Sequence, residues 1–270
     1  MTQSGLVSVI IPTFNRGNLI ARAIQSVLNQ TYGLLEVIII DDGSTDNTES
    51  VVKTIKDARI RYYWFKNSGS PARSRNKGIE LACGEFLSFL DSDDSWLPDK
   101  LQKQVQYMLR NPDCFLVYAK CLLQSEGRAI IESPKVMLGG CIFKELYLSY
   151  NFISCLTVLM KNSRDYRPYY FCEDRKLFAA EDYDLWLNIA KNEKIGYLDE
   201  TLAIYNLHDS NISSGAYATF MKWHYIAYKF RDNVPKSVFL KKMLLLYVKF
   251  LELSGIMLLQ KTSRLFKSLK

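Results

Sequence analysis

The stretch Gly84-Glu85-Phe86-Leu87-Ser88-Phe89-Leu90-Asp91-Ser92-Asp93-Asp94 joins a short apolar run to an acidic end. An apolar run of this length, bounded by a glycine and by acids, predicts a buried β-strand that ends in a polar crevice. Asp91 and Asp93 are two residues apart, so on an extended chain they point to the same side. Such a pair suits a hard divalent ion that leaves room for phosphate oxygens, and it equally suits a polar turn before the next helix.

Strand-like and helix-like patterns alternate ahead of this stretch. Segments rich in apolar residues at 7–11, 36–40 and 60–65 predict three earlier strands, and the second of them is a continuous apolar run typical of a sheet covered on both faces. Helical spacing of apolar residues, or a helix-start signal, falls in each interval, and a further helix is expected over 98–110. The βαβαβαβ order predicts an α/β fold with a mainly parallel, doubly wound sheet flanked by helices.

Acidic residues follow two of the predicted strands. Asp41-Asp42 comes directly after the second strand, and 91–94 follows the fourth. Ligands of doubly wound sheets bind outside the carboxyl ends of the strands. The two acidic loops therefore predict one ligand site at that edge of the sheet.

The cysteine pattern argues against a zinc or redox protein. The chain has 270 residues and six cysteines, and none of the six forms a C-x-x-C pair. Reduced thiols and a cytoplasmic location are the simplest expectation. The segment 1–7 is polar and too short for a secretion signal.

Basic charge is concentrated at the C-terminal end. The chain carries a net charge of +7, and residues 216–270 hold eleven Lys or Arg against two acids. A shift in composition near 213–215 predicts a catalytic domain over 1–215 and a basic, apolar-rich helical tail over 216–270. No nucleic-acid motif accompanies the tail, so nucleic acid is not expected as a partner. Residues 241–270 suit peripheral contact with the inner face of the cell membrane, or packing against the domain.

Four segments occur in an order that is informative as a set. They are 7–16 (VSVIIPTFNR), 40–46 (IDDGSTD), 90–96 (LDSDDSW) and 181–186 (EDYDLW). This order resembles the family 2 glycosyltransferases with the GT-A fold over roughly residues 5–215, and the segment 70–78 resembles that family's Ala-Arg-Asn-x-Gly helix start. The extra basic residue Arg73 and the tail after about residue 216 depart from the family pattern.

The resemblance implies a UDP-sugar donor. Pro12, Thr13 and Phe14 would hold the base, and Asp42 would accept the imide N–H of uracil. Arg73 and Arg75, at a helix start, would meet the diphosphate. The alternative for Asp42 is a turn cap, and for the two arginines a solvated helix face.

The resemblance also implies a divalent metal, Mn²⁺ or Mg²⁺. Asp93 would bind the ion directly, while Asp91 would contact the ribose or reach the ion through water. His208 lies in a Tyr-x-x-His-x-x-Asn-x-Ser pattern and would touch the metal or the diphosphate.

The acceptor side is expected at 181–186. Asp182 would be the general base that takes the proton of the acceptor hydroxyl. Glu181 and Trp186 would contact the acceptor sugar. A helix cap for Glu181 and a core position for Trp186 are the alternatives.

These roles together imply an inverting transfer to a saccharide hydroxyl. The family analogy suggests a lipid-linked acceptor on undecaprenyl diphosphate, in O-antigen or capsule synthesis. Two alternatives stay open: a phosphotransferase of the haloacid dehalogenase type, and a non-catalytic sugar-nucleotide-binding protein. The dehalogenase pattern belongs on the first strand of its domain, whereas three βα units precede Asp91 here.

Overall fold

A computed structural model describes residues 2–125, 128–133, 138–163, 168–207 and 216–268. The chain divides into two compact units. The first comprises residues 1–146 and 151–211, and the second comprises 147–150 and 212–270. His208, which the sequence analysis placed at the metal, lies outside the described residues.

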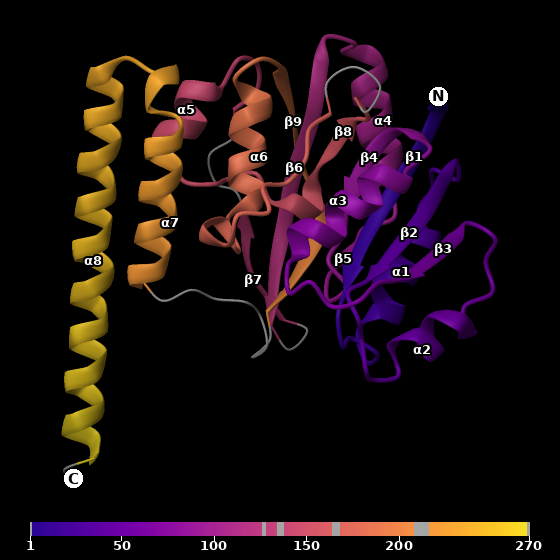
Figure 1. Cartoon of the computed structure of the whole chain (residues 1–270), viewed down its shortest axis with the longest axis horizontal. Helices are drawn as coiled ribbons and strands as arrows, with labels where there is room; N and C mark the ends of the chain where they lie inside the picture. The colour runs from indigo at the N-terminus through magenta and orange to yellow at the C-terminus, as the bar shows by residue number, and fades with distance from the viewer. Residues whose placement is uncertain (1, 126–127, 134–137, 164–167, 208–215, 269–270) are drawn as a thin grey trace. The chain divides into compact units, whose positions relative to one another are not determined.

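The first unit is built on one mixed sheet (Figure 1). Its described strands run in the order β3-β2-β1-β4-β8-β6-β9-β5, and β7 pairs with β6. The strands are β1 (Gln3–Thr13), β2 (Leu35–Asp41), β3 (Ile60–Trp64), β4 (Gly84–Phe89), β5 (Ser95–Trp96), β6 (Cys114–Ser125), β7 (Arg128–Ser133), β8 (Leu159–Lys161) and β9 (Lys194–Leu207).

Parallel pairing covers the half of the sheet that the apolar runs predicted. Strands β3, β2, β1 and β4 pair in parallel, with Ile10 of β1 opposite Ile38 on one side and Phe89 on the other. Most residues of β1, β2 and β4 are buried, which explains their largely apolar sequences, whereas β3 at the end of the sheet is only partly buried. The predicted α/β fold is confirmed. Beyond β4 the sheet becomes mixed, because β8 runs antiparallel to both β4 and β6.

Helices cover both faces of the sheet. Apolar residues of α1 and α4 pack in one core with alternate residues of β1 and β2. On the other face, Gly78 of α3 lies against Ile10 so closely that a Cβ at this position would meet Ile10 Cγ2 at 2.4 Å. Trp186 of α6 packs on Phe171, which packs on Phe89 of β4. The helices of this unit are α1 (Ile20–Leu28), α2 (Thr48–Thr54), α3 (Pro71–Leu81), α4 (Lys100–Arg110), α5 (Phe143–Leu148, which continues into the second unit) and α6 (Glu181–Ala190).

Two local patterns take a different form in the fold. Residues 156–160 have a strand-like sequence, but Cys155–Thr157 is a 3-10 helix and only Leu159–Lys161 forms β8. The apolar runs at 195–198 and 202–205 belong to one long strand, β9. The pairing of β9 with β6 shifts in register near Ala119 and Lys120, which lets a single strand pass the polar residues between the two runs.

The second unit contains two helices, α7 (Ala216–Lys229) and α8 (Lys236–Ser268). The segment 147–150 packs with them: the Tyr147 hydroxyl donates to Ala227 O at 2.9 Å, and Lys242 Nζ donates to Ser149 O at 2.6 Å. Burial lowers the pKa of Lys242 to about 8. In the described part of the chain, no helix combines the length and the apolar character needed to cross a membrane.

Candidate active site

The loops after β1 and β2 lie side by side, as the parallel pairing requires. Thr13 pairs with Asp41 at the strand ends, and the Asp42 amide donates to Thr13 O at 2.9 Å. Asn15 has a positive φ of 51°, and its side-chain oxygen accepts from the Thr45 amide at 2.8 Å. These bonds fasten the two loops to each other. The predicted base-binding residues therefore sit beside the predicted uracil partner, and the Phe14 ring is exposed.

Asp42 is a buried carboxylate that organises the loop before α3. Its Oδ1 accepts from the Ser68 amide at 2.8 Å, and its Oδ2 accepts from the Ser68 hydroxyl and the Gly69 amide, each at 3.1 Å. A carboxylate offers about four lone-pair sites, so these three bonds leave capacity for one further donor such as an imide N–H. Both roles of Asp42, as a loop organiser and as a base partner, are compatible with this geometry.

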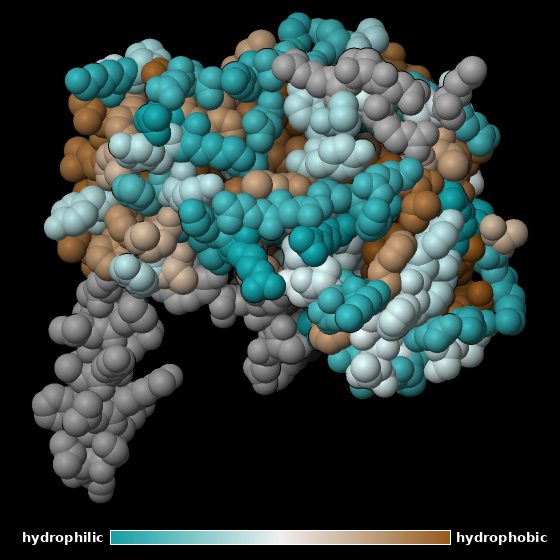
Figure 2. Space-filling view, in the orientation of Figure 1, coloured by the Kyte–Doolittle hydropathy of each residue, from teal (hydrophilic) through white to brown (hydrophobic). Residues whose placement is uncertain are grey.

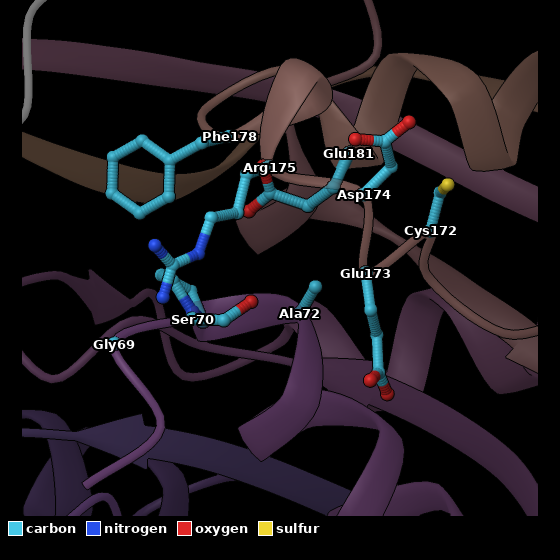
Figure 3. Close-up of a pocket in the computed structure, with 10 residues that line it drawn as sticks. Gly69, Ser70, Ala72, Cys172, Glu173, Asp174, Arg175, Phe178 and Glu181 are labelled. Atoms are coloured by element: carbon cyan, nitrogen blue, oxygen red, sulfur yellow. The ribbon is translucent and has the colours of Figure 1, made fainter.

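A small pocket opens next to that loop (Figure 3). One wall is Gly69 to Ala72, at the start of α3, and the other is formed by residues 172–175 with Phe178 and Glu181. The pocket thus reaches from the segment held by Asp42 to the first residue of α6. Of the predicted site residues, Glu181 lines this pocket.

The two arginines of α3 have different surroundings. Arg73 is exposed and pairs with Glu173 at 3.0 Å, whereas Arg75 is buried. Arg75 Nη2 lies 2.7 Å from Asp91 Oδ1, and Nη1 lies 2.8 Å from Glu181 Oε1. Two carboxylates hold the Arg75 guanidinium here, and the diphosphate role of both arginines stays a prediction.

The acidic loop after β4 contains two partly accessible carboxylates and one buried carboxyl. The side chain of Asp91 is about one-third exposed, and Asp93 Oδ2 lies 3.9 Å from Arg16 Nε. Asp94 Oδ1 accepts from the Asn206 amide of β9 at 2.8 Å, while its Oδ2 is buried with no hydrogen-bond partner among the described residues. Burial, reinforced by the charges of Asp91 and Asp93, raises the pKa of Asp94 well above its usual value. The bond to Asn206 anchors the loop to β9.

The acidic loop offers some, but not all, of the ligands that a divalent ion needs. Among the described residues, no three His, Cys, Asp or Glu side chains gather into a complete metal site. Asp93 supplies a hard oxygen ligand, and the ion would need oxygens of a bound diphosphate and water to fill its shell. Mg²⁺ and Mn²⁺ sites built around substrate phosphates have this composition. The residues present fit an ion that binds together with a nucleoside diphosphate.

Asp182 occupies the first turn of α6 and is only partly buried. Its Oδ1 accepts from the Tyr183 amide at 2.7 Å, and its Oδ2 accepts from Asn151 Nδ2 at 2.9 Å. Burial, together with the charge of Glu181, raises the pKa of Asp182 to about 6. A carboxylate with this pKa is ionised at neutral pH and is more basic than an ordinary aspartate, as a general base should be.

The two residues expected to contact the acceptor are buried. Glu181 Oε1 accepts from Arg75, and its Oε2 accepts from the Ala180 amide at 3.0 Å. Trp186 is fully buried, and its Nε1 donates to Ile153 O at 3.0 Å. Trp186 has no exposed surface on which a sugar could stack, whereas Glu181 lines the pocket beside α3, and the acceptor roles of both stay predictions. The helical spacing that made Trp186 a core candidate was the better guide, because apolar faces of helices pack inward.

Three further residues shape the site. Asn151 donates a hydrogen bond to Asp182. Asn206 Nδ2 donates to the Asp93 carbonyl at 3.0 Å and so holds the acidic loop. Cys155 lies among the charges of Arg75, Asp91, Glu181 and Asp182. Burial raises the pKa of the Cys155 thiol well above its usual value, so the thiol stays neutral. No periodic pattern marks Asn151 or Cys155, whereas Asn206 stands in the Tyr-x-x-His segment at 205–213.

Replacing Trp186 with phenylalanine tests its core position. The change removes one buried hydrogen bond and leaves a small void, so we expect the free energy of unfolding to fall by about 1–3 kcal/mol. The KM for acceptor should stay within about twofold of the original value. Chemical denaturation and initial-rate kinetics measure the two quantities.

Trp64, an exposed tryptophan of β3, provides the matched control. Trp64→Phe should change the free energy of unfolding by less than about 0.5 kcal/mol. A large rise in the acceptor KM of Trp186→Phe, with unchanged stability, would restore the acceptor-stacking role.

Comparison with known proteins agrees with this arrangement. The model of the family described as "Glycosyl transferase family 2" matches residues 8–130. An uncharacterized glycosyltransferase of Rickettsia felis is 35% identical over 216 residues, which cover 80% of this chain and 34% of the relative. The chain therefore spans about a third of that relative's length.

In two further comparisons, the match covers a larger share of the other protein. The Escherichia coli enzyme WfgD, named as a UDP-Glc:alpha-D-GlcNAc-diphosphoundecaprenol beta-1,3-glucosyltransferase, is 32% identical over 78% of this chain and 81% of its own. The mannosyltransferase PcManGT of Pyrobaculum calidifontis, solved with GDP-Man and Mn²⁺, superposes with a TM-score of 0.68 at 18% identity, over 92% of this chain and 73% of its own. With its sheet, acidic loops and relatives in agreement, this chain belongs to glycosyl transferase family 2.

Proposed function

We propose that this protein transfers a sugar from a UDP-sugar to a hydroxyl group of a saccharide acceptor, with inversion at the anomeric carbon. The acceptor oxygen forms the new bond to that carbon while the bond to the UDP oxygen breaks. The electron pair of the broken bond leaves with UDP, and the proton of the acceptor hydroxyl passes to Asp182. The carboxylate serves as a general base in hydrogen-bond reach of the nucleophile.

The environment of Asp182 is the observation that carries this proposal. It combines partial exposure, a pKa raised to about 6, and two hydrogen bonds that orient its oxygens. Because the base must be ionised, activity should decline as the pH falls through about 6. The buried Arg75 joins Glu181, the neighbour of Asp182, to Asp91 of the acidic loop. The proposed base therefore stands next to the proposed donor site.

The donor end of the site suits a uridine nucleotide. Asp42 keeps acceptor capacity beside Thr13 and the exposed ring of Phe14, while Arg73 is the accessible arginine of α3. A base with an imide N–H would match Asp42. The UDP-glucose donor in the name of WfgD supports the same class of donor for this chain.

Mn²⁺ or Mg²⁺ is the proposed cofactor, with Asp93 as its protein ligand and Asp91 beside the ribose. When bound, the ion supplies Lewis-acid stabilisation of the diphosphate charge. PcManGT, which shares the fold, was solved with Mn²⁺, and this supports the assignment by analogy. His208 remains a candidate second ligand.

The two alternative functions are less well supported. A haloacid dehalogenase needs its Asp-x-Asp on the first strand, whereas Asp91 follows β4, the fourth strand in the chain. A non-catalytic sugar-nucleotide-binding protein would have no use for a carboxylate with a raised pKa outside the donor loop. Glycosyl transfer accounts for both acidic regions at once.

A direct assay tests the proposed function. Purified protein is incubated with Mn²⁺, a panel of UDP-sugars and a GlcNAc-diphosphate-lipid acceptor, and UDP release is compared with and without acceptor. We expect acceptor-dependent UDP release for at least one donor, and a product whose anomeric configuration, read by NMR, is opposite to that of the donor. A product of retained configuration would reject single displacement with Asp182 as base.

The acceptor is proposed to be lipid-linked, as the name of WfgD states for that enzyme. The second unit suits a peripheral position at the membrane. The exposed apolar residues Leu240, Leu244, Val248 and Leu251 follow one another at helical spacing on α8, and Figure 2 shows hydrophobic surface over the described part of this unit. The basic charge of 216–270 complements anionic lipid.

Replacing Leu240, Leu244 and Val248 together with glutamate should reduce membrane binding by at least about tenfold. The change removes apolar area and adds negative charge facing anionic lipid. Flotation with phosphatidylglycerol vesicles measures the bound fraction. The control replaces Leu109, an exposed leucine of α4 in the first unit, with glutamate. Equal recovery of the triple variant and the original protein would reject the membrane role of α8.

A further inference from the structure

The buried ion cluster around Arg75 performs no step in the transfer proposed above, yet it adjoins both reacting sides. We propose that Arg75 is a positioning residue, which ties Asp91 of the donor loop to Glu181 and thereby holds the carboxylate of Asp182 where it meets the acceptor. This inference rests on the proposed function, in which Asp182 is the base. It assigns Arg75 and Glu181 to the placement of the base, in place of direct contact with diphosphate or acceptor.

The geometry of the cluster is that of a bridge between three separate elements. Arg75 belongs to α3, Asp91 follows β4, and Glu181 begins α6. The guanidinium uses a different nitrogen for each carboxylate, at 2.7 Å and 2.8 Å, and lies 5.3 Å from the ring centroid of Phe171. A planar, always charged guanidinium can hold two carboxylates in a set orientation, which a lysine ammonium cannot do as rigidly.

Glu181 passes this restraint on to Asp182. The Glu181 side chain is only 8% exposed, and its second oxygen accepts from the Ala180 amide directly before α6. Both oxygens of Glu181 therefore accept hydrogen bonds from the protein, and these bonds fix the position of the first turn of α6. Asp182 is the next residue, and Asn151 Nδ2 donates to its Oδ2 at 2.9 Å. A buried ion pair of this kind adds little net stability compared with apolar packing, so a role in placing neighbouring groups is a better reason for it.

The charges around Asp182 allow this role to be measured. The groups that face it are Glu181 on its own helix, Arg75 from α3, Asn151 and Cys155. The Glu181 charge raises the pKa of Asp182, whereas Arg75 lowers it. The acid limb is the fall of kcat on the acidic side of its pH profile. Removing the Glu181 charge should move this limb to lower pH, and removing the Arg75 charge should move it to higher pH. A cluster that only stabilised the fold would not produce opposite shifts.

The experiment compares kcat as a function of pH at saturating UDP-sugar and Mn²⁺ for the original protein and for Arg75→Met and Glu181→Gln. We expect the acid limb to move up by about half a pH unit or more in Arg75→Met, and down by a similar amount in Glu181→Gln. The plateau kcat should fall at least about tenfold in both, because the base is less well placed. The KM for donor should rise only in Arg75→Met, since that change also releases Asp91.

Two further variants keep the test decisive. Arg75→Lys retains the charge but not the two-pronged geometry, so its acid limb should return toward the original position while kcat stays low. Lys77→Met, on the exposed side of α3, is the matched control and should change neither quantity. If Arg75→Met does not fold, the positioning role is tested by two other results: the downward shift in the pH dependence of kcat in Glu181→Gln, and the low plateau kcat of Arg75→Lys.

The outcomes separate this inference from the proposed function. If Asp182→Asn abolishes transfer but the acid limb moves in neither variant, or moves the same way in both, the positioning role is rejected and the base assignment stands. If Asp182→Asn transfers sugar at the original rate, the proposed function itself fails.

Discussion

Asp182→Asn is expected to reduce the rate of sugar transfer by roughly 10²- to 10⁴-fold, the usual contribution of a positioned general base. The amide keeps the size of the carboxylate and can still accept a hydrogen bond from the Tyr183 amide, so the fold should be retained. Asparagine cannot take the acceptor proton. The dissociation constant for UDP should stay within about threefold, because the change lies outside the loops after β1, β2 and β4.

The measurements are single-turnover transfer and calorimetric titration with UDP and Mn²⁺. Asp184→Asn is the matched control on the same helix, where the carboxylate is buried and accepts from Asn188. We expect its transfer rate to stay within a fewfold of the original. The decline of kcat below about pH 6 should disappear from the residual activity of Asp182→Asn. Transfer by this variant at the original rate would remove Asp182 from the mechanism.

Asp93→Ala should abolish the part of donor binding that depends on metal. Calorimetry of UDP binding with and without Mn²⁺ measures this part, and we expect a loss of at least tenfold in affinity, or about 1.4 kcal/mol. The physical reason is that Asp93 is the accessible carboxylate proposed to hold the ion against the diphosphate. Binding without metal should be weak and similar in both proteins.

Asp94→Asn is the control for that prediction. Asp94 is buried and accepts from the Asn206 amide, and an asparagine at this position can keep that bond through its side-chain oxygen while the carboxylate of Asp93 is unchanged. Metal-dependent UDP binding should therefore persist in Asp94→Asn. If Asp94→Asn lost this binding and Asp93→Ala kept it, the two roles would have to be exchanged.

Local sequence patterns were sufficient for the first half of the sheet and for placing the loops of Asp42 and Asp91 at its carboxyl edge. Strands β1, β2 and β4 are largely buried on both faces, and each run is long enough to be recognised without knowledge of its neighbours. Their carboxyl ends meet at one edge in any parallel sheet, which brings the loops of Asp42 and Asp91 together. Asp182 was identified through the resemblance of the whole set of motifs, since its helix lies about ninety residues further along the chain.

The second half of the sheet was less predictable. Strand β8 has only three residues and follows a 3-10 helix, so its apolar pattern spans two different structures. Its place between β4 and β6 depends on pairing with strands that are distant in sequence. Such pairings are decided by the complete sheet, and no short window of residues contains them.

The order of motifs along this sequence was enough to define the family, the fold and the acids proposed to carry the chemistry, because strand patterns and strand-end loops are local properties. The direction and surroundings of individual side chains were decided by packing. The linear sequence left a core position open for Trp186 and suggested an accessible Arg75, and α3 and α6 turn both side chains toward the interior. There Arg75 is held between Asp91 and Glu181, and Trp186 is enclosed in the core. Burial also gives Asp182 its raised pKa, since the cost of a charge depends on the groups that the fold brings around it.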